Sequence, residues 1–369
     1  MEEKKVEYLE LIYDLIFVYI IGRNNSLLHD VESGFVRPGV FLAYIISSLA
    51  IIQIWNYSTF YTNMHGRNSI RDHVFMFINM FLLYFIGEGT RIHWEGYLIP
   101  YNTAWALILF NIGVQYLLEY RDPGHCPEGR KTMRGLMTAL FGEAAIILLA
   151  IPAGERFQAL MAGAAVLYGI AVTWVLGKDS TGERIDFSHL SERAMLYVVF
   201  TFGEMIIVAA AYFEDELSFN TLYFAGMTFL IVAGLFVCYE ILYDHIIDRE
   251  QQNNGLGYMM LHILLVFGLN SITTSLEFMR NPEISLWPKT ILLNLSFLLI
   301  YGCMAGLFRY AKPEFRAKRG FSLPAILLPC LFVALMLLFM EQMAVNIMIS
   351  VLFVSAQVLI IGFAAKMSA

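Results

Sequence analysis

Three acidic residues interrupt an apolar stretch near the N-terminus, and they are the first candidates for chemistry. Glu7, Glu10 and Asp14 lie in residues 7–21, a segment that otherwise has the composition of a transmembrane helix. An ionised Asp at the centre of a membrane helix costs about 2.5–3.5 kcal/mol on insertion scales. Because Glu10 and Asp14 are four residues apart, they share one helix face. The spacing predicts a face directed at water, an ion or a charged partner.

A second group of ionisable residues lies near the middle of the chain. Arg193 and Glu204 are eleven residues apart, about three helical turns, so they share a face of one helix. Two carboxylates that are close together in a low-dielectric site suit proton exchange. We therefore predict a proton or cation site, formed by Asp14 and Glu204, between two halves of the chain. The alternative is that a local Arg or backbone group neutralises each carboxylate, which then only fixes helix packing.

Five further residues complete the candidate site. Glu10 is either an inward partner of Asp14 or an interfacial residue, and the sequence favours neither. Glu143 and Glu240 each lie within an apolar run and are candidates to line the same cavity. His189 and Glu192 are placed beside Arg193 at the cytoplasmic mouth.

The composition is typical of a polytopic membrane protein. The 369 residues are 58% hydrophobic and 15% charged, whereas a soluble chain has about 25% charged residues. The net charge of −7, without a basic stripe, argues against nucleic acid as a partner. The lipid bilayer is the expected environment.

Motifs for other chemistry are absent from the sequence. There is no Walker loop, no G-x-G-x-x-G before a helix, no H-E-x-x-H and no G-x-S-x-G. ATP-driven transport by this chain alone is therefore not expected, and neither a cofactor nor a metal site is predicted. Aromatic clusters such as Trp55–Tyr57 are expected to pack between helices. The cysteines show no paired spacing and are interpreted as packing residues: Cys126, Cys238, Cys303 and Cys330.

Apolar stretches of about 20 residues predict an all-α fold with about twelve transmembrane helices. Very short connections at 152–156 and 341–342 predict two helical hairpins. The predicted spans are 7–22, 39–61, 73–88, 101–120, 135–151, 157–177, 194–213, 219–243, 257–277, 289–309, 323–340 and 343–365.

The distribution of basic residues predicts the orientation in the membrane. With the N-terminus inside, 18 of the 24 Lys and Arg residues fall in cytoplasmic segments and 6 on the opposite side. Cytoplasmic loops carry the excess of basic residues in membrane proteins. Both termini are therefore expected to be cytoplasmic.

Loop lengths and sparse polar residues suggest an internal repeat. At an offset of 190 residues, the segment 14–18 aligns with 204–208 and pairs Asp14 with Glu204. We predict two six-helix halves, residues 1–180 and 181–369, which together form one integral membrane domain. Because six is even, both halves enter the membrane in the same direction, which defines a parallel repeat.

Three motifs together resemble those of the bacterial low temperature requirement protein A family. Residues 10–18, Glu-Leu-Ile-Tyr-Asp-Leu-Ile-Phe-Val, are similar to the opening E-L-x-x-D-L-[VI]-F-V of that family. Residues 54–63 resemble the end of its second span, a Trp followed by a Tyr-x-Asn element. Residues 189–193, His-Leu-Ser-Glu-Arg, continue to Gly203-Glu204 and are similar to its H-L-x-E-R … G-E element.

This sequence departs from the family pattern at one place, and the resemblance implies little about biochemical activity. The family usually has an acidic turn after the second span, where this chain has Met-His-Gly-Arg-Asn-Ser-Ile-Arg-Asp at 64–72. The resemblance implies a multi-pass protein of the bacterial plasma membrane, and it carries no settled biochemical activity. It points to the functional positions Glu10, Asp14, His189, Glu192, Arg193 and Glu204.

Our leading hypothesis is a secondary transporter or ion-conducting protein that handles H⁺ or a small cation and an unidentified solute. One alternative is a membrane-embedded enzyme acting on lipid or envelope precursors, although the sequence contains no visible pairing of a nucleophile with a base. A second alternative is a non-catalytic membrane scaffold or sensor. The sequence leaves the oligomeric state open.

Overall fold

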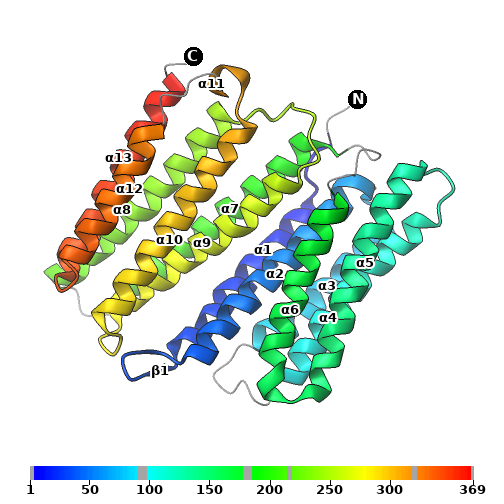
Figure 1. The fold of residues 1–369 in the computed structure, drawn as a ribbon, viewed down its shortest axis with the longest axis horizontal. Helices are drawn as coiled ribbons and strands as arrows, with labels where there is room; N and C mark the ends of the chain where they lie inside the picture. Colours follow the sequence, from blue (N-terminus) through cyan, green and yellow to red (C-terminus); the bar gives the residue numbers. More distant parts are fainter. Residues whose placement is uncertain (1–3, 90–97, 178–184, 214–217, 317–321, 367–369) are drawn as a thin grey trace. The chain divides into compact units, whose positions relative to one another are not determined.

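The computed structural model describes residues 4–89, 98–177, 185–213, 218–316 and 322–366 (Figure 1). It is all-helical, with 86% helix. The helices are α1 (Tyr8–Asn24), α2 (Pro38–His65), α3 (Ile70–Glu88), α4 (Leu98–Tyr120), α5 (Pro127–Ala150), α6 (Glu155–Gly177), α7 (Phe187–Ala210), α8 (Phe219–Ile241), α9 (Leu256–Arg280), α10 (Leu286–Leu307), α11 (Pro313–Arg316), α12 (Ser322–Leu338) and α13 (Met343–Lys366).

A two-stranded hairpin joins α1 to α2. Its strands are β1 (Val31–Glu32) and β2 (Phe35–Val36). Ser33 and Gly34, between the strands, have positive φ angles of 54° and 88°. Two consecutive residues with positive φ match the twist that a tight hairpin turn requires.

Each of the twelve predicted apolar ranges overlaps one of the longer helices. Nine of the described helices are long and apolar enough to cross a membrane. Of the other long helices, α1 and α12 have 17 residues each, and α4 contains the polar Asn102, Asn111 and Gln115. The chain is therefore a polytopic helical membrane protein, and twelve crossings in two parallel repeats stay a prediction.

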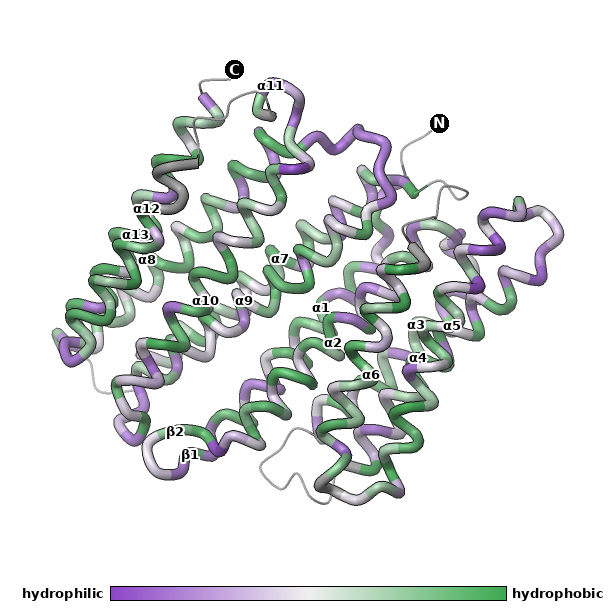
Figure 2. The backbone as a smooth tube through the Cα atoms, in the orientation of Figure 1, coloured by the Kyte–Doolittle hydropathy of each residue, from purple (hydrophilic) through white to green (hydrophobic). Residues whose placement is uncertain are grey.

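Local sequence signals determine where several helices begin. Pro38 and Pro127 occupy the first turns of α2 and α5, where the missing backbone N–H costs no helical hydrogen bond. At the start of α3, Ser69 and Asp72 form a reciprocal capping box. The predicted hairpins between α5 and α6 and between α12 and α13 are confirmed. Hydrophobic residues dominate the helices, and the loop between α4 and α5 is hydrophilic (Figure 2).

The structure divides into two compact units, which we describe separately. Unit 1 comprises Met1–Asp30, Val36–Tyr197 and Gln252–Ile263. Within it, α1 packs against α2 and α3, α4 packs against α3 and α5, and α6 packs against α5 and α2. Its core contains the fully buried Trp55 and Trp105.

Unit 2 comprises Val31–Phe35, Val198–Gln251 and Leu264–Ala369. Helix α13 packs against α8 and α12, and α12 also packs against α10. Phe297, Phe332 and Phe353 form an aromatic core in this unit, with ring centroids 4.2–5.9 Å apart. Since α7 and α9 each contribute residues to both units, the units do not coincide with the predicted halves, which stay a prediction.

Candidate functional site

A fully buried arginine is the centre of a charged network in unit 1. The Arg193 guanidinium hydrogen-bonds to Asp14 through Nη2, and its Nε lies 3.4 Å from Oδ2 of the same carboxylate. Its Nη1 donates to Thr62 Oγ1 at 2.7 Å and lies 3.5 Å from Glu10 Oε1. Asp14 also accepts a hydrogen bond of 2.7 Å from Trp55 Nε1. We call Glu10, Asp14, His189 and Arg193 the Arg193 network.

A histidine extends this network from Glu10 towards α2. His189 Nε2 lies 3.2 Å from Glu10 Oε2, and its Nδ1 lies 3.0 Å from Asn63 Nδ2. The Asn63 amide nitrogen also donates to the Asp186 carbonyl at 2.8 Å, which identifies that nitrogen as a donor. Nδ1 of His189 is therefore an acceptor, and we infer that a neutral His189 carries its hydrogen on Nε2 and donates it to Glu10.

The helical repeat accounts for the convergence of these side chains. Glu10 and Asp14 are one turn apart on α1, and His189 and Arg193 are one turn apart on α7. Trp55 and Thr62 are seven residues apart on α2, which places them two turns apart on one face. Three helix faces thus meet at Arg193.

Burial makes the charged groups of this network costly in free energy unless they are paired. Asp14 and Arg193 are 0% exposed and Glu10 is 4% exposed. Charges removed from water are tolerated when they are paired and hydrogen-bonded, and removing one partner leaves the other uncompensated. With a neutral His189, the network carries two carboxylates and one guanidinium, and the Lys4 ammonium lies close enough to Glu10 for their charges to interact. A proton or cation site at these residues stays a prediction.

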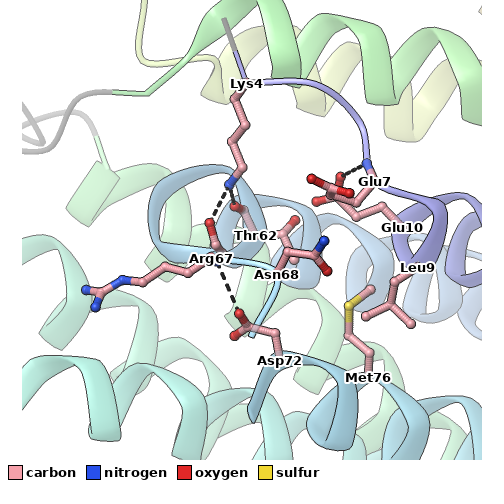
Figure 3. Close-up of a pocket in the computed structure, with 10 residues that line it drawn as sticks. Lys4, Glu7, Leu9, Glu10, Thr62, Arg67, Asn68, Asp72 and Met76 are labelled. Atoms are coloured by element: carbon pink, nitrogen blue, oxygen red, sulfur yellow. Dashed lines mark hydrogen bonds between the residues drawn. The ribbon is translucent and has the colours of Figure 1, made fainter. Parts of the chain in front are cut away.

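A cavity of about 110 Å³ lies beside Glu10 (Figure 3). Its wall includes Glu7, Glu10, Thr62 and Asp72. A space of this size with charged residues in its wall has room for water molecules. Glu10 therefore has a route to water, and Asp14 lies one helical turn further along α1.

Lys4 closes part of this cavity. Its ammonium group donates to the carbonyl oxygens of Thr62 and, at 2.9 Å, of Gly66 (Figure 3). These carbonyls lie at the C-terminal end of α2, where the helix dipole favours a cation. Burial lowers the pKa of Lys4 from its usual value, and the nearby Glu10 carboxylate opposes that shift.

Glu143 lies in unit 1 and contacts a different set of residues. Its Oε2 accepts hydrogen bonds from Gln53 Nε2 at 3.2 Å and from the Tyr57 hydroxyl at 3.1 Å. It is 0% exposed on α5. The expected cavity shared with Asp14 stays a prediction for Glu143.

The remaining predicted residues lie at three separate places. Glu192 is half-buried on α7, next in sequence to Arg193. Glu240 is exposed on α8. Glu204 is half-buried in unit 2, where it is close enough to Glu277 for their charges to interact. Asp14 and Glu204 belong to different units, and a site shared by them stays a prediction.

The sequence did not single out the polar residues of α2 that support the network. Trp55 was expected to serve packing, and Thr62 and Asn63 were not singled out individually. A usable signal was present, because the segment 54–63 carries one of the three family motifs and includes all of these residues. What could not be foreseen is that Asp14 and Arg193, 179 residues apart, are direct partners.

A second ionisable cluster in unit 1 has the residue types of a metal site. Ligand atoms of His65, Glu119 and His125 lie within 4.8 Å of one another. However, both oxygens of Glu119 already accept hydrogen bonds of 2.7 Å, from Arg67 and Arg71 respectively. Two guanidinium groups on one carboxylate oppose a further cation, so we assign no metal to this cluster.

The helices and the buried Arg193 network define a multi-pass membrane protein with an ionisable site inside its helical bundle. The family model for bacterial low temperature requirement A protein (LtrA) matches residues 5–359. The chain belongs to this family, as its three motifs had indicated. No curated protein and no solved structure matches the chain.

Proposed function

We propose that the protein is a secondary transporter or ion-conducting protein of the bacterial plasma membrane, with a proton or cation site at the Arg193 network. The observation that carries the proposal is a fully buried Arg193 that is shared by two carboxylates, one of which lines a cavity. Ionisable groups inside a membrane protein are costly and line ion or proton pathways.

The asymmetry between the two carboxylates supports a direction of entry. Glu10 lines the cavity and is 3.5 Å from Arg193, whereas Asp14 makes the closer contact and has an additional donor in Trp55. A proton that arrives through the cavity reaches Glu10 before it reaches Asp14. When Glu10 is protonated, Arg193 keeps Asp14 as a charged partner, and His189 retains contact with the neutral acid. With cytoplasmic termini, this cavity opens to the cytoplasm.

Glu204 is the proposed second carboxylate of the pathway. It is half-buried on α7 and interacts with Glu277 within unit 2. Two neighbouring carboxyl groups in an apolar environment favour retention of one proton between them. We propose that Glu204 exchanges this proton during transport.

A flux assay in proteoliposomes tests the proposal. Wild type, Glu10→Gln, Asp14→Asn and Glu204→Gln are compared under imposed proton, Na⁺ and K⁺ gradients. Glu128→Gln is the matched control, because Glu128 is exposed at the start of α5. We expect the three site variants to lose most of the gradient-driven flux and the control to retain it. Unchanged flux in Glu10→Gln and Asp14→Asn, with folding intact, would overturn the proposal and favour a scaffold or sensor.

A further inference from the structure

A carboxyl group that forms no ion pair with any described residue lies inside the helical bundle of unit 1. Glu143 is 0% exposed, and its described neighbours are Gln53, Tyr57 and Trp105. Among the residues that the structure describes, no Lys, Arg or His forms an ion pair with it. An isolated ionised carboxylate in an apolar interior is so costly that the group takes up a proton instead.

The hydrogen bonds around Glu143 are incomplete in a way that a proton would improve. Four buried polar atoms here lack a hydrogen bond of good distance and angle within the described part of the chain, although Trp105 interacts with the Glu143 carboxyl group and Thr173 with the Tyr57 hydroxyl: Glu143 Oε1, Gln53 Oε1, Trp105 Nε1 and Thr173 Oγ1. Two of them are acceptor oxygens and one is a donor only. A proton on Glu143 Oε1 converts one of the acceptors into a donor. Unsatisfied buried groups of this kind require an explanation.

A glycine on α6 makes room for the cluster. A Cβ atom added at Gly169 would collide with the Glu143 carboxylate, the Gln53 amide and the Tyr57 hydroxyl. Three polar groups from α2 and α5 therefore pack directly against the backbone of α6. By contrast, a Cβ at Gly163 on the same helix would meet only Ile46, at an ordinary contact distance of 3.4 Å. The close approach at Gly169 is specific to the polar cluster.

From this geometry we infer that Glu143 is a proton-binding site, separate from the Arg193 network, and that it holds its proton at neutral pH. The ligand is the proton itself, bound by the carboxyl oxygen and released to regenerate the carboxylate. Among the described residues, the titratable group that contacts Glu143 is Tyr57 on α2. Its hydroxyl supplies no positive charge. The role of this proton in transport rests on the proposed function, whereas its presence on Glu143 does not.

Infrared difference spectroscopy of the protein in proteoliposomes tests the inference. Protonated carboxyl groups and carboxylates absorb at separate frequencies. At neutral pH we expect Glu143→Gln to lose a protonated-carboxyl band that wild type shows, and Glu128→Gln to lose only carboxylate absorption. Glu143→Asp, which keeps the acid, should shift the band. If Glu143→Gln lost carboxylate absorption instead, the inference would be overturned.

The glycine offers a test that leaves the carboxyl group in place. Gly169→Ala should shift the Glu143 band, because the added methyl group displaces its hydrogen-bond partners, and Gly163→Ala should leave the band unchanged. An identical response in both variants would contradict the proposed cluster. Flux provides the separate test of transport: a loss in Glu10→Gln with full flux in Glu143→Gln would retain the proposed function and remove Glu143 from it.

Discussion

The carboxyl groups of Asp14 and Glu143 are both buried in unit 1, and the cost of burying a carboxylate is met differently at each. Asp14 and Glu143 are both 0% exposed, and both accept hydrogen bonds from side chains of α2. Asp14 is paired with Arg193, whereas the described residues that donate hydrogen bonds to Glu143, Gln53 and Tyr57, are neutral. The first centre keeps its charge through a cation, and the second avoids charge by holding a proton. Equal burial therefore does not imply equal chemistry.

The contrast predicts how each centre responds to change. In the Arg193 network, stability depends on the balance of positive and negative charge. Removing one charged residue leaves a remaining buried charge without a partner of opposite sign. In the Glu143 cluster, stability depends on shape and hydrogen bonding, so an amide of the same shape is tolerated.

Replacing Arg193 should be the most destabilising single change in unit 1. Arg193→Met leaves the Glu10 and Asp14 carboxylates buried without a cation, and we expect a loss of about 3–5 kcal/mol in the free energy of unfolding. Denaturant unfolding in detergent measures it. The control is Arg37→Met, since Arg37 forms an exposed ion pair with Asp30, and its cost should be at most about 1 kcal/mol. Equal losses in both variants would contradict the assigned role of Arg193.

Neutralising Asp14 should have a smaller effect, because Arg193 keeps Glu10 as a partner. We expect Asp14→Asn to cost about 1.5–3 kcal/mol, the range for hydrogen bonds to charged groups. A double-mutant cycle sharpens the test. The combined Asp14→Asn and Arg193→Met variant should lose less stability than the sum of the single losses, because each change removes the same interaction. Additive losses would show that the two residues are not coupled.

Glu143→Gln should cost less than about 1 kcal/mol in unfolding free energy, since a neutral acid is replaced by an amide of the same shape. The measurement is the same denaturant titration, with Glu128→Gln alongside. A loss as large as that of Asp14→Asn would indicate that Glu143 is ionised. That result would remove the contrast between the two centres.

Lys4 gives the smallest effect, through the pH dependence of stability. Its folded-state pKa is lowered by burial, so the unfolded chain binds more protons between that value and the ordinary lysine pKa of about 10.4. Stability should therefore rise with pH across this window. Lys4→Met should remove this contribution, which unfolding at stepped alkaline pH detects as a difference from wild type. A wild-type curve parallel to that of Lys4→Met would show that the cavity beside Glu10 leaves Lys4 fully hydrated.

Some features of the fold were accessible from the sequence because they depend on local composition. In a membrane, an apolar run of about 20 residues can form all its backbone hydrogen bonds within the run only as a helix. The helix positions therefore followed from run length alone. The short hairpins followed from the brevity of the connections at 152–156 and 341–342. The three motifs also identified the family that the comparison confirmed. The number of membrane crossings was harder to predict, because α1, α4 and α12 are too short or too polar to be identified as membrane spans by length and composition.

What the sequence determined by itself is the membrane class, the family and the identity of the costly ionisable residues. Only the tertiary structure decided which of them are paired. The repeat made Asp14 and Glu204 counterparts, which stays a prediction, and the fold shows that Asp14 contacts Arg193 and Trp55. The reason is physical: the desolvation cost of a charge can be read from its position in an apolar run, but its compensation depends on which distant helix face lies a few ångströms away.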